Sequence, residues 1–202
     1  MGSQIANANT YNLEDAGTYT KDLNTGLEWL DLSFTRGQSY NEVVSQLSSN
    51  PSLSGWRFAT FDEFSAIFTS RGYGFSGSTK LTTSTGLHPY DYFFETLISN
   101  FGVTISSSGY VVSRGILADD RRSGIQNFQY YGQINFFGSP ENNHGFATIG
   151  QVFDHDSGPQ LGSFLVRESA VSQVPEPSTW ILMMLGLIFI AYVNKKHHLN
   201  FN

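Results

Sequence analysis

Two aspartates separated by one residue are the first candidates for chemistry. Asp154 and Asp156 precede Gly158 in the segment Asp-His-Asp-Ser-Gly. Alternating carboxylates followed by a glycine are typical of the beginning of a loop that binds a hard cation such as calcium. No glutamate follows at EF-hand spacing, and the segment also suits a polar turn between two strands. The sequence therefore leaves two interpretations open, a calcium site at Asp154 and Asp156 or a turn without any cofactor.

Signatures of catalysis are sparse in this chain. It contains no His-Glu-x-x-His, no Gly-x-Ser-x-Gly, no P-loop and no dinucleotide-binding fingerprint. It also contains no cysteine, which excludes disulfides and thiolate metal sites. We therefore expect a protein that is not an enzyme and has no catalytic residues. The alternative is a secreted hydrolase of matrix polymers, which would need two carboxylates or a histidine-activated nucleophile to converge on folding.

Aromatic residues make up 15% of the chain and are a second source of binding chemistry. An exposed ring can stack on a sugar, whereas a buried ring stabilises the core. We expect Trp29 and Trp56 in the core, with Arg57 packing or pairing beside a helix start at Thr60. Most other rings should also be buried. The candidate walls of a sugar-binding site are Tyr73, Phe75, Tyr130, Tyr131, Phe136 and Phe137.

The C-terminal segment carries the most specific pattern. It begins with the residues Val174, Pro175, Glu176, Pro177, Ser178, Thr179 and Trp180. An uncharged apolar run continues to Val193, and Lys195 and Lys196 follow it. As a helix, residues 180–193 would be about 21 Å long, shorter than the ~30 Å hydrocarbon core of a bilayer. The prolines prevent this helix from extending backwards, while Trp180 and the two lysines suit the two membrane interfaces.

These residues resemble the PEP-CTERM sorting signal of Gram-negative bacteria, which is also known as the ice-binding-protein C-terminal motif. The resemblance implies recognition near Pro-Glu-Pro by exosortase, a membrane cysteine peptidase or transpeptidase. It also implies a transient stay in the inner membrane and delivery to the cell surface or matrix of an organism that makes exopolysaccharide and biofilm. We therefore assign residues 169–179 to a linker with the Pro-Glu-Pro box, 180–193 to a transmembrane or sorting helix, and 194–202 to a basic cytoplasmic tail. The tail has Lys-Lys-His-His where arginine-rich tails are commoner.

The N-terminus carries a shorter pattern. Ala6 and Ala8 stand before Asn9 in the Ala-x-Ala arrangement that signal peptidase prefers. The charged and apolar regions of a complete secretory signal do not precede them. We interpret residues 1–8 as the remnant of a secretory signal cleaved after Ala8, and the alternative is a polar N-terminus without a signal.

Composition limits the class of partner. The 202 residues include 11 Lys and Arg against 17 Asp and Glu, which gives a formal net charge of -6. An acidic protein has no electrostatic reason to bind nucleic acid. The length suits one domain of ordinary size with short additions at its ends.

The elements between the two ends indicate an α+β fold. Ser39 with Glu42, and Thr60 with Glu63, have the spacing of capping boxes, so we expect helices over residues 39–48 and 60–70. A third helix should occupy residues 90–101. The residues expected to face inward are Val43, Val44 and Leu47 in the first helix, Phe64, Ile67 and Phe68 in the second, and Phe93, Phe94, Leu97 and Ile98 in the third.

Strands should follow these helices and one should precede them. Residues 27–32 alternate apolar and acidic side chains, which predicts a half-buried strand. Further strands are expected over residues 110–112, 125–137, 145–153 and 163–166. Together these segments predict a single α+β domain over residues 9–168, with two to three helices in the first half and a mainly antiparallel sheet.

Three patches in this region carry a second resemblance. They are Asn-Thr-Gly-Leu-Glu-Trp-Leu-Asp at 24–31, Ser-Gly-Trp-Arg-Phe-Ala-Thr-Phe-Asp-Glu-Phe at 54–64, and Gly-Ser-Phe-Leu-Val-Arg at 162–167. They resemble the Lcl C-terminal-like domain, although Phe58-Ala59 replaces the usual Leu-Pro. The resemblance implies a C-type-lectin-like fold and a relation to surface adhesin modules that bind sulfated polysaccharides. Our hypothesis is an exosortase-sorted surface or biofilm-matrix protein with a non-catalytic binding or structural module, directed toward exopolysaccharide.

Overall fold

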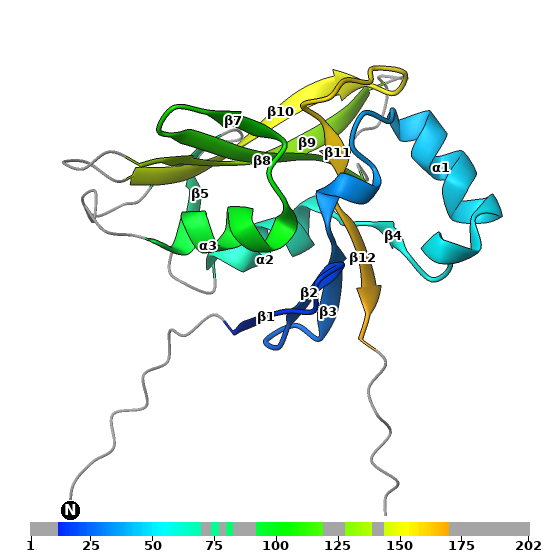
Figure 1. Ribbon diagram of the computed structural model, residues 1–202, viewed down its shortest axis with the longest axis horizontal. Helices are drawn as coiled ribbons and strands as arrows, with labels where there is room; N and C mark the ends of the chain where they lie inside the picture. Colours follow the sequence, from blue (N-terminus) through cyan, green and yellow to red (C-terminus); the bar gives the residue numbers. More distant parts are fainter. Residues whose placement is uncertain are drawn as a thin grey trace, which may run out of the picture. The chain divides into compact units, whose positions relative to one another are not determined.

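The computed structural model describes residues 12–69, 74–76, 80–82, 92–118, 128–138 and 144–169. Contacts divide the chain into two compact units, residues 1–169 and 170–202, and every described residue belongs to the first unit. The described residues form three α-helices and two sheets (Figure 1). The predicted α+β domain is therefore confirmed. None of its helices is long and apolar enough to cross a membrane, and the helix predicted over 180–193 lies outside the described residues.

The helices are α1 (Tyr40–Ser49), α2 (Phe61–Thr69) and α3 (Tyr92–Phe101). The first two begin at the predicted capping boxes. The Ser39 hydroxyl accepts the N–H of Glu42 at 3.3 Å, and the Glu42 carboxylate accepts the N–H of Ser39 at 2.7 Å. Thr60 and Glu63 make the same reciprocal pair at 3.2 and 2.8 Å. Each box satisfies backbone donors that have no partner within the helix, which fixes where these helices begin.

The small sheet has the order β1-β2-β3-β12-β4, and all its pairs are antiparallel. Its strands are β1 (Leu13–Asp15), β2 (Tyr19–Asp22), β3 (Leu27–Leu30), β12 (Leu165–Glu168) and β4 (Arg57–Phe58). The predicted half-buried strand over 27–32 is wrong in two respects. Strand β3 is buried along its whole length, including Glu28, and Leu32 belongs to a 3-10 turn, η1 (Leu32–Phe34). Glu28 tolerates burial because Arg167 of the neighbouring strand β12 neutralises it.

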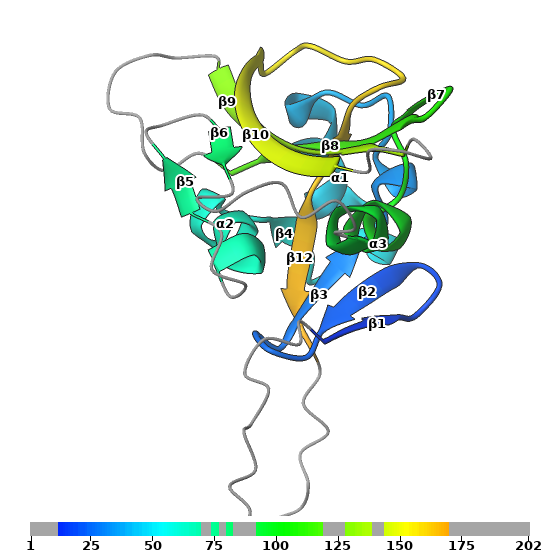
Figure 2. The ribbon, with the colours of Figure 1, turned by 90° about the vertical axis from the view of Figure 1, so that its left-hand side faces the viewer.

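The large sheet has the order β11-β8-β9-β10-β6-β5, and β7 pairs with β8 on the same edge as β11. Its strands are β5 (Gly74–Ser76), β6 (Lys80–Thr82), β7 (Ile105–Ser107), β8 (Tyr110–Leu117), β9 (Phe128–Phe137), β10 (His144–Phe153) and β11 (Gly162–Ser163). Strand β11 runs parallel to β8, and the other pairs are antiparallel. Figure 2 shows how β8, β9 and β10 curl, with α2 and α3 on one side.

The expected strand over 163–166 is two strands in different sheets. Ser163 pairs with β8 of the large sheet, whereas Leu165 pairs with β4 of the small sheet. The crossing residue is Phe164, whose N–H bonds to the carbonyl of Ile116 and whose carbonyl accepts the N–H of Ala59. The apolar run from Phe164 to Val166 predicted extended chain, but the change of partner depends on both sheets being present.

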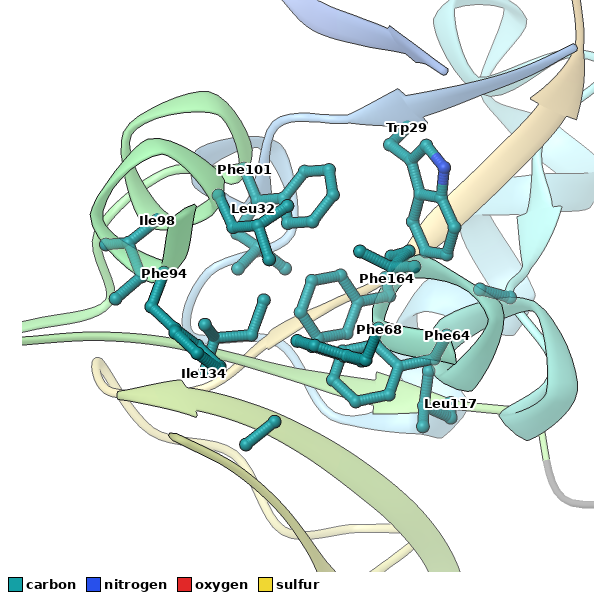
Figure 3. Packing of buried hydrophobic residues seen from close by; sticks show 14 of the residues in the cluster. Trp29, Leu32, Phe64, Phe68, Phe94, Ile98, Phe101, Leu117, Ile134 and Phe164 are labelled. Atoms are coloured by element: carbon teal, nitrogen blue, oxygen red, sulfur yellow. The ribbon is translucent and has the colours of Figure 1, made fainter. Parts of the chain in front are cut away.

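The core lies between the two sheets, where α2 and α3 are placed (Figures 1 and 2). Figure 3 shows rings from both helices converging on Trp29 and Phe164. The centroid of the Phe164 ring lies 5.1 Å from that of Phe64 and 5.9 Å from that of Phe101. All seven inward-facing residues predicted for the second and third helices are buried. Without cysteine, this aromatic packing is the main source of the domain's stability.

Helix α1 packs elsewhere, against a second cluster that includes Ile116 of β8. Val43 is fully buried in that cluster and Leu47 is partly buried against it. Val44, which was expected to face inward, is 43% exposed. The prediction for Val44 is wrong because only one narrow stripe of a ten-residue helix contacts the sheet, and Val44 lies about 100° around the helix from Val43.

Glycines on strands of the large sheet let two helices approach closely. A Cβ on Gly132 would lie 2.6 Å from Cζ of Phe64, which belongs to α2. A Cβ on Gly145 would overlap the ring of Phe94, which belongs to α3. Real Cβ atoms do not approach carbon atoms this closely, so each ring fits only because the residue beneath it is a glycine without a side chain.

Replacing Gly145 by Ala should destabilise the domain. Phe94 would have to move within a densely packed core, which typically costs about 1–3 kcal/mol. Gly158→Ala is the control, because nothing lies within 4 Å of the Cβ position at Gly158. Urea unfolding of the two variants and the wild type measures the difference. Equal midpoints for Gly145→Ala and Gly158→Ala would contradict the close approach.

The pair formed by Glu63 and Arg57 should make stability depend on pH. Burial tends to raise the pKa of Glu63, but the bonds from Arg57 and Thr60 outweigh it and hold that pKa below its usual value. A carboxyl group whose pKa is lowered on folding contributes stability above its usual pKa, and this contribution is lost as the pH falls through the lowered value. Wild type should exceed Glu63→Gln by about 1 kcal/mol at pH 7.

Urea unfolding of both proteins at pH 7 and pH 3 tests this expectation. The difference between them should shrink at pH 3, because the lowered pKa of Glu63 means that the unfolded wild type binds a proton there more readily than the folded protein does. A difference of the same size at both pH values would show that the charge of Glu63 does not contribute.

Candidate functional site

The two faces of the large sheet separate the aromatic residues that were candidate walls of a sugar site. Successive side chains of a strand point to opposite faces. Phe136 lies in the core with α2 and α3, and Tyr130 packs partly against it. Tyr131 and Phe137 have the opposite parity and are only partly buried. Tyr73 and the side chain of Phe75 lie outside the described residues.

We define the outer face as the side of β8, β9 and β10 turned away from α2 and α3 (Figure 2). The cross-strand register places Tyr110 opposite Phe137, Arg114 opposite Gln133, and Ile116 opposite Tyr131. Near Ile116 this face is covered by the second hydrophobic cluster, which includes Val43 of α1. The main residues of this face beyond the cluster are Tyr110, Arg114, Gln133, Asn135 and Phe137, together with Tyr131, which packs partly against the cluster.

A chain of hydrogen bonds fixes the polar side chains of the outer face. The Tyr110 hydroxyl donates to Oδ1 of Asn135 at 2.8 Å, and Nε2 of Gln133 donates to the same oxygen at 2.5 Å. Nε of Arg114 donates to Oε1 of Gln133 at 2.7 Å. Asn135 is fully buried, whereas Tyr110, Arg114 and Gln133 are half-buried. Asn135 therefore serves as a rigid base that orients the three more accessible side chains.

Aromatic rings flank this polar chain on both sides. The rings of Tyr110 and Phe137 lie 4.4 Å apart, and Phe137 stacks on Phe146 of β10 at 5.9 Å. On the other side, the guanidinium of Arg114 lies 5.3 Å from the centre of the Tyr131 ring. A rigid hydrogen-bonding strip bordered by half-exposed rings can hold a ligand that has both hydroxyl groups and apolar C–H faces.

Arg114 differs from Arg57, Arg167 and Lys21, three other cations that belong to the two sheets. Arg57 and Arg167 lie 2.6 Å from the carboxylates of Glu63 and Glu28, and Lys21 of β2 is also within 4 Å of a carboxylate. In the described part of the chain, no carboxylate lies within this distance of Arg114. A guanidinium placed in this way can bind an anionic or hydroxyl-bearing ligand.

Arg167 illustrates the structural use of a cation in the same domain. Its Nε lies 2.6 Å from Oε2 of Glu28, and its guanidinium stacks 4.4 Å from the ring centre of Trp56 and 5.2 Å from that of Tyr19. These contacts tie β12 to β2, β3 and the segment before β4. Sequence analysis missed this cluster, although an acid within the apolar segment Leu-Glu-Trp-Leu signals the need for a buried cationic partner.

The other residues of the tryptophan patches lie where the sequence predicted. Trp29 and Trp56 are buried, at 1% and 7% exposure. Arg57 pairs with Glu63 of the capping box through two hydrogen bonds, at 2.6 and 2.9 Å. These residues stabilise the junction between β4 and α2, and they are part of the framework of the domain.

Asp154 and Asp156 lie in the turn that follows β10. Oδ2 of Asp156 accepts the N–H of Phe153 at 3.1 Å, which closes the turn, and the carbonyl of Asp154 accepts the N–H of Asn41 at 3.2 Å. One carboxylate oxygen of Asp154 is buried and accepts no hydrogen bond from the described residues. Burial, followed by the charge of Asp154, raises the pKa of Tyr40. The two aspartates therefore belong to a closed turn after β10.

Metal binding at these aspartates is a separate question. The described residues contain no group of three or more histidines and carboxylates that would hold a metal ion. One carboxylate oxygen of Asp156 already accepts a hydrogen bond from the backbone of the turn. Calcium at Asp154 and Asp156 stays a prediction that rests on the spacing of the two residues.

Residues 173–196 match the PEP-CTERM protein-sorting motif. The sorting signal identified in the sequence is thereby confirmed. The motif implies processing by exosortase and export through the membrane pathway of that enzyme. The individual motif residues lie outside the described residues, as do Ala6 and Ala8, so their separate roles stay predictions.

Comparisons with curated proteins and with solved structures gave no significant match. The resemblance to the Lcl C-terminal-like domain, with the C-type-lectin-like fold that it implies, therefore stays a prediction. The outer face was also not predicted as a site. Gln129, Gln133 and Asn135 alternate along one strand, which signals a polar face, but only the register with β8 brings Tyr110 and Arg114 beside them.

Proposed function

We propose that this protein is sorted by exosortase to the cell surface or matrix of a Gram-negative bacterium, where its domain binds extracellular polysaccharide through the outer face. The outer face supports the binding role. Its hydrogen-bonded chain from Tyr110 to Arg114 offers planar donors and acceptors for sugar hydroxyls. Tyr131 and Phe137 offer half-exposed rings on which the C–H face of a pyranose can stack.

The charge of the outer face favours an acidic polysaccharide. The whole chain carries a net charge of -6, but among the six main residues of this face Arg114 is positive and none is negative. A guanidinium binds a carboxylate through two parallel hydrogen bonds. The stacking of Arg114 on Tyr131 and its bond to Gln133 hold the guanidinium in place before a ligand arrives. Such preorganisation lowers the entropic cost of binding.

A binding role also suits the outer face better than catalysis does. The six residues that define this face include no carboxylic acid. Glycoside hydrolases usually act with two carboxyl groups on either side of the scissile bond. The outer face therefore supports a module that holds a polysaccharide without cleaving it.

The sorting part of the proposal predicts the behaviour of two truncations in the organism that produces the protein. Deleting residues 174–202 should move the protein from the envelope to the medium or periplasm, because almost all of the matched motif is lost. Deleting residues 197–202 is the control, since it leaves the match at 173–196 intact. Cell fractionation with immunoblotting measures both. The same fractionation for the two truncations would overturn the sorting role.

The binding part predicts the effect of removing the cation of the outer face. Arg114→Ala should weaken binding of the detergent-solubilised full chain to immobilised alginate about tenfold or more, which corresponds to loss of a charge-assisted hydrogen bond. Lys21→Ala removes the same charge from the small sheet and should bind like the wild type. Equal losses in both variants would show that only net charge matters. Absence of binding to alginate and to neutral dextran by the folded wild type would overturn the binding role.

A further inference from the structure

A second cluster of rings lies at the other end of the hairpin formed by β9 and β10. Phe128 begins β9 and Phe153 ends β10, and the register pairs them directly. Their ring centroids lie 4.1 Å apart, and the imidazole of His155 lies 5.4 Å from the Phe153 ring at an angle of 31°. We call Phe128, Phe153 and His155 the aromatic platform.

The aromatic platform is accessible to solvent. Phe153 is 42% exposed and the side chain of His155 is 73% exposed, while Phe128 is partly buried. Other exposed large hydrophobic residues of the described chain, such as Phe34 and Leu23, have no ring contact among the described residues. Phe153 instead contacts two other rings, which are tilted by 35° and 31° to its plane. This cluster keeps an apolar surface in contact with water at a free-energy cost.

The backbone holds the platform in a fixed position. The N–H of Asp156 donates to the carbonyl of Phe153 at 3.0 Å, and the N–H of Phe153 donates to the carboxylate of Asp156 at 3.1 Å. The N–H of Asn41 donates to the carbonyl of Asp154, which attaches the turn to α1. The rings are thus presented by a closed turn on the end of a long hairpin, so binding would require little ordering.

Polar groups beside the platform suit a sugar better than another apolar surface. Oδ1 of Asp156 lies 4.0 Å from Nε2 of His155, and the side chain of Asp156 is 45% exposed. A pyranose stacked on Phe153 would present hydroxyl groups at its rim, where this carboxylate can accept and the imidazole can donate or accept a hydrogen bond. A purely apolar partner would leave both groups without bonds on docking.

The platform and the outer face lie on opposite sides of the large sheet. Along β9, Phe128 has the parity of the inward-facing Ile134, whereas Tyr131 and Phe137 have the parity of the outer face. Tyr131 lies three residues from Phe128 and Phe137 lies nine residues from it, which is about 10 and 30 Å along an extended strand. Because the two surfaces face opposite directions, a straight polysaccharide segment that lies on one of them does not contact the other.

We propose that the aromatic platform is a second glycan-binding site, so that one molecule bridges two polysaccharide chains. The proposal rests on the polysaccharide-binding function proposed for the outer face and adds a site that is built independently of it. The outer face holds an acidic chain through Arg114, and the platform holds a second chain by stacking on Phe153. Cross-linking of the matrix is the consequence.

A sandwich assay on the full chain in detergent tests this proposal. The protein is captured on immobilised alginate, excess is washed away, and fluorescent alginate or fluorescent dextran is added in solution. Wild type should capture the labelled polysaccharide. Phe153→Ala should still bind the immobilised alginate but capture at least tenfold less of the labelled chain. Phe34→Ala is the matched control, since it removes an equally exposed phenylalanine from η1 and should behave like the wild type.

The outcomes separate the two proposals. Equal capture by wild type and Phe153→Ala overturns the second site and leaves binding at the outer face standing. Loss of all binding in Phe153→Ala, with normal binding in Arg114→Ala, makes the platform the principal site and overturns the role of the outer face. If the folded wild type binds neither polysaccharide, both proposals fail. Urea unfolding of each variant confirms that an altered signal does not come from an unfolded protein.

Discussion

Phe164 occupies the place where the chain leaves the large sheet and enters the small one. Its backbone bonds to Ile116 on one side and Ala59 on the other, and its ring contacts Trp29, Phe64 and Phe101. Because both sheets share this short segment, neither can separate from the core without disrupting it. This packing has a free-energy cost, since the indole N–H of Trp29 is buried without an acceptor among the described residues.

The arginines of the two sheets have two kinds of surroundings. Arg57 and Arg167 are each paired with a glutamate and bind one structural element to another. Arg114 is instead bonded to Gln133 and lies over the ring of Tyr131. A cation that is rigidly placed but lacks a carboxylate among the described residues is suited to recognition, because the ligand then supplies the opposite charge.

The curled hairpin of β9 and β10 connects the proposed functions to this framework. One of its faces is anchored to the core by glycines that admit Phe64 and Phe94, which leaves the opposite face for Gln133 and Asn135. Its ten residue pairs run without interruption. The hairpin therefore holds Phe137 at one end and Phe128 at the other apart and on opposite sides of the sheet. Rigidity of the hairpin is therefore what would let the domain hold two polysaccharide chains at separate places.

The sequence by itself was sufficient to predict the features that depend on neighbouring residues. The two capping boxes, the inward residues of α2 and α3 and the sorting motif at 173–196 each depend on residues close together in the chain. Tertiary structure decided the rest. The burial of Glu28, the exposure of Val44, the crossing at Phe164 and the meeting of Arg114 with Gln133 all depend on pairings between distant segments. Strand register sets these pairings, and no single segment carries that information.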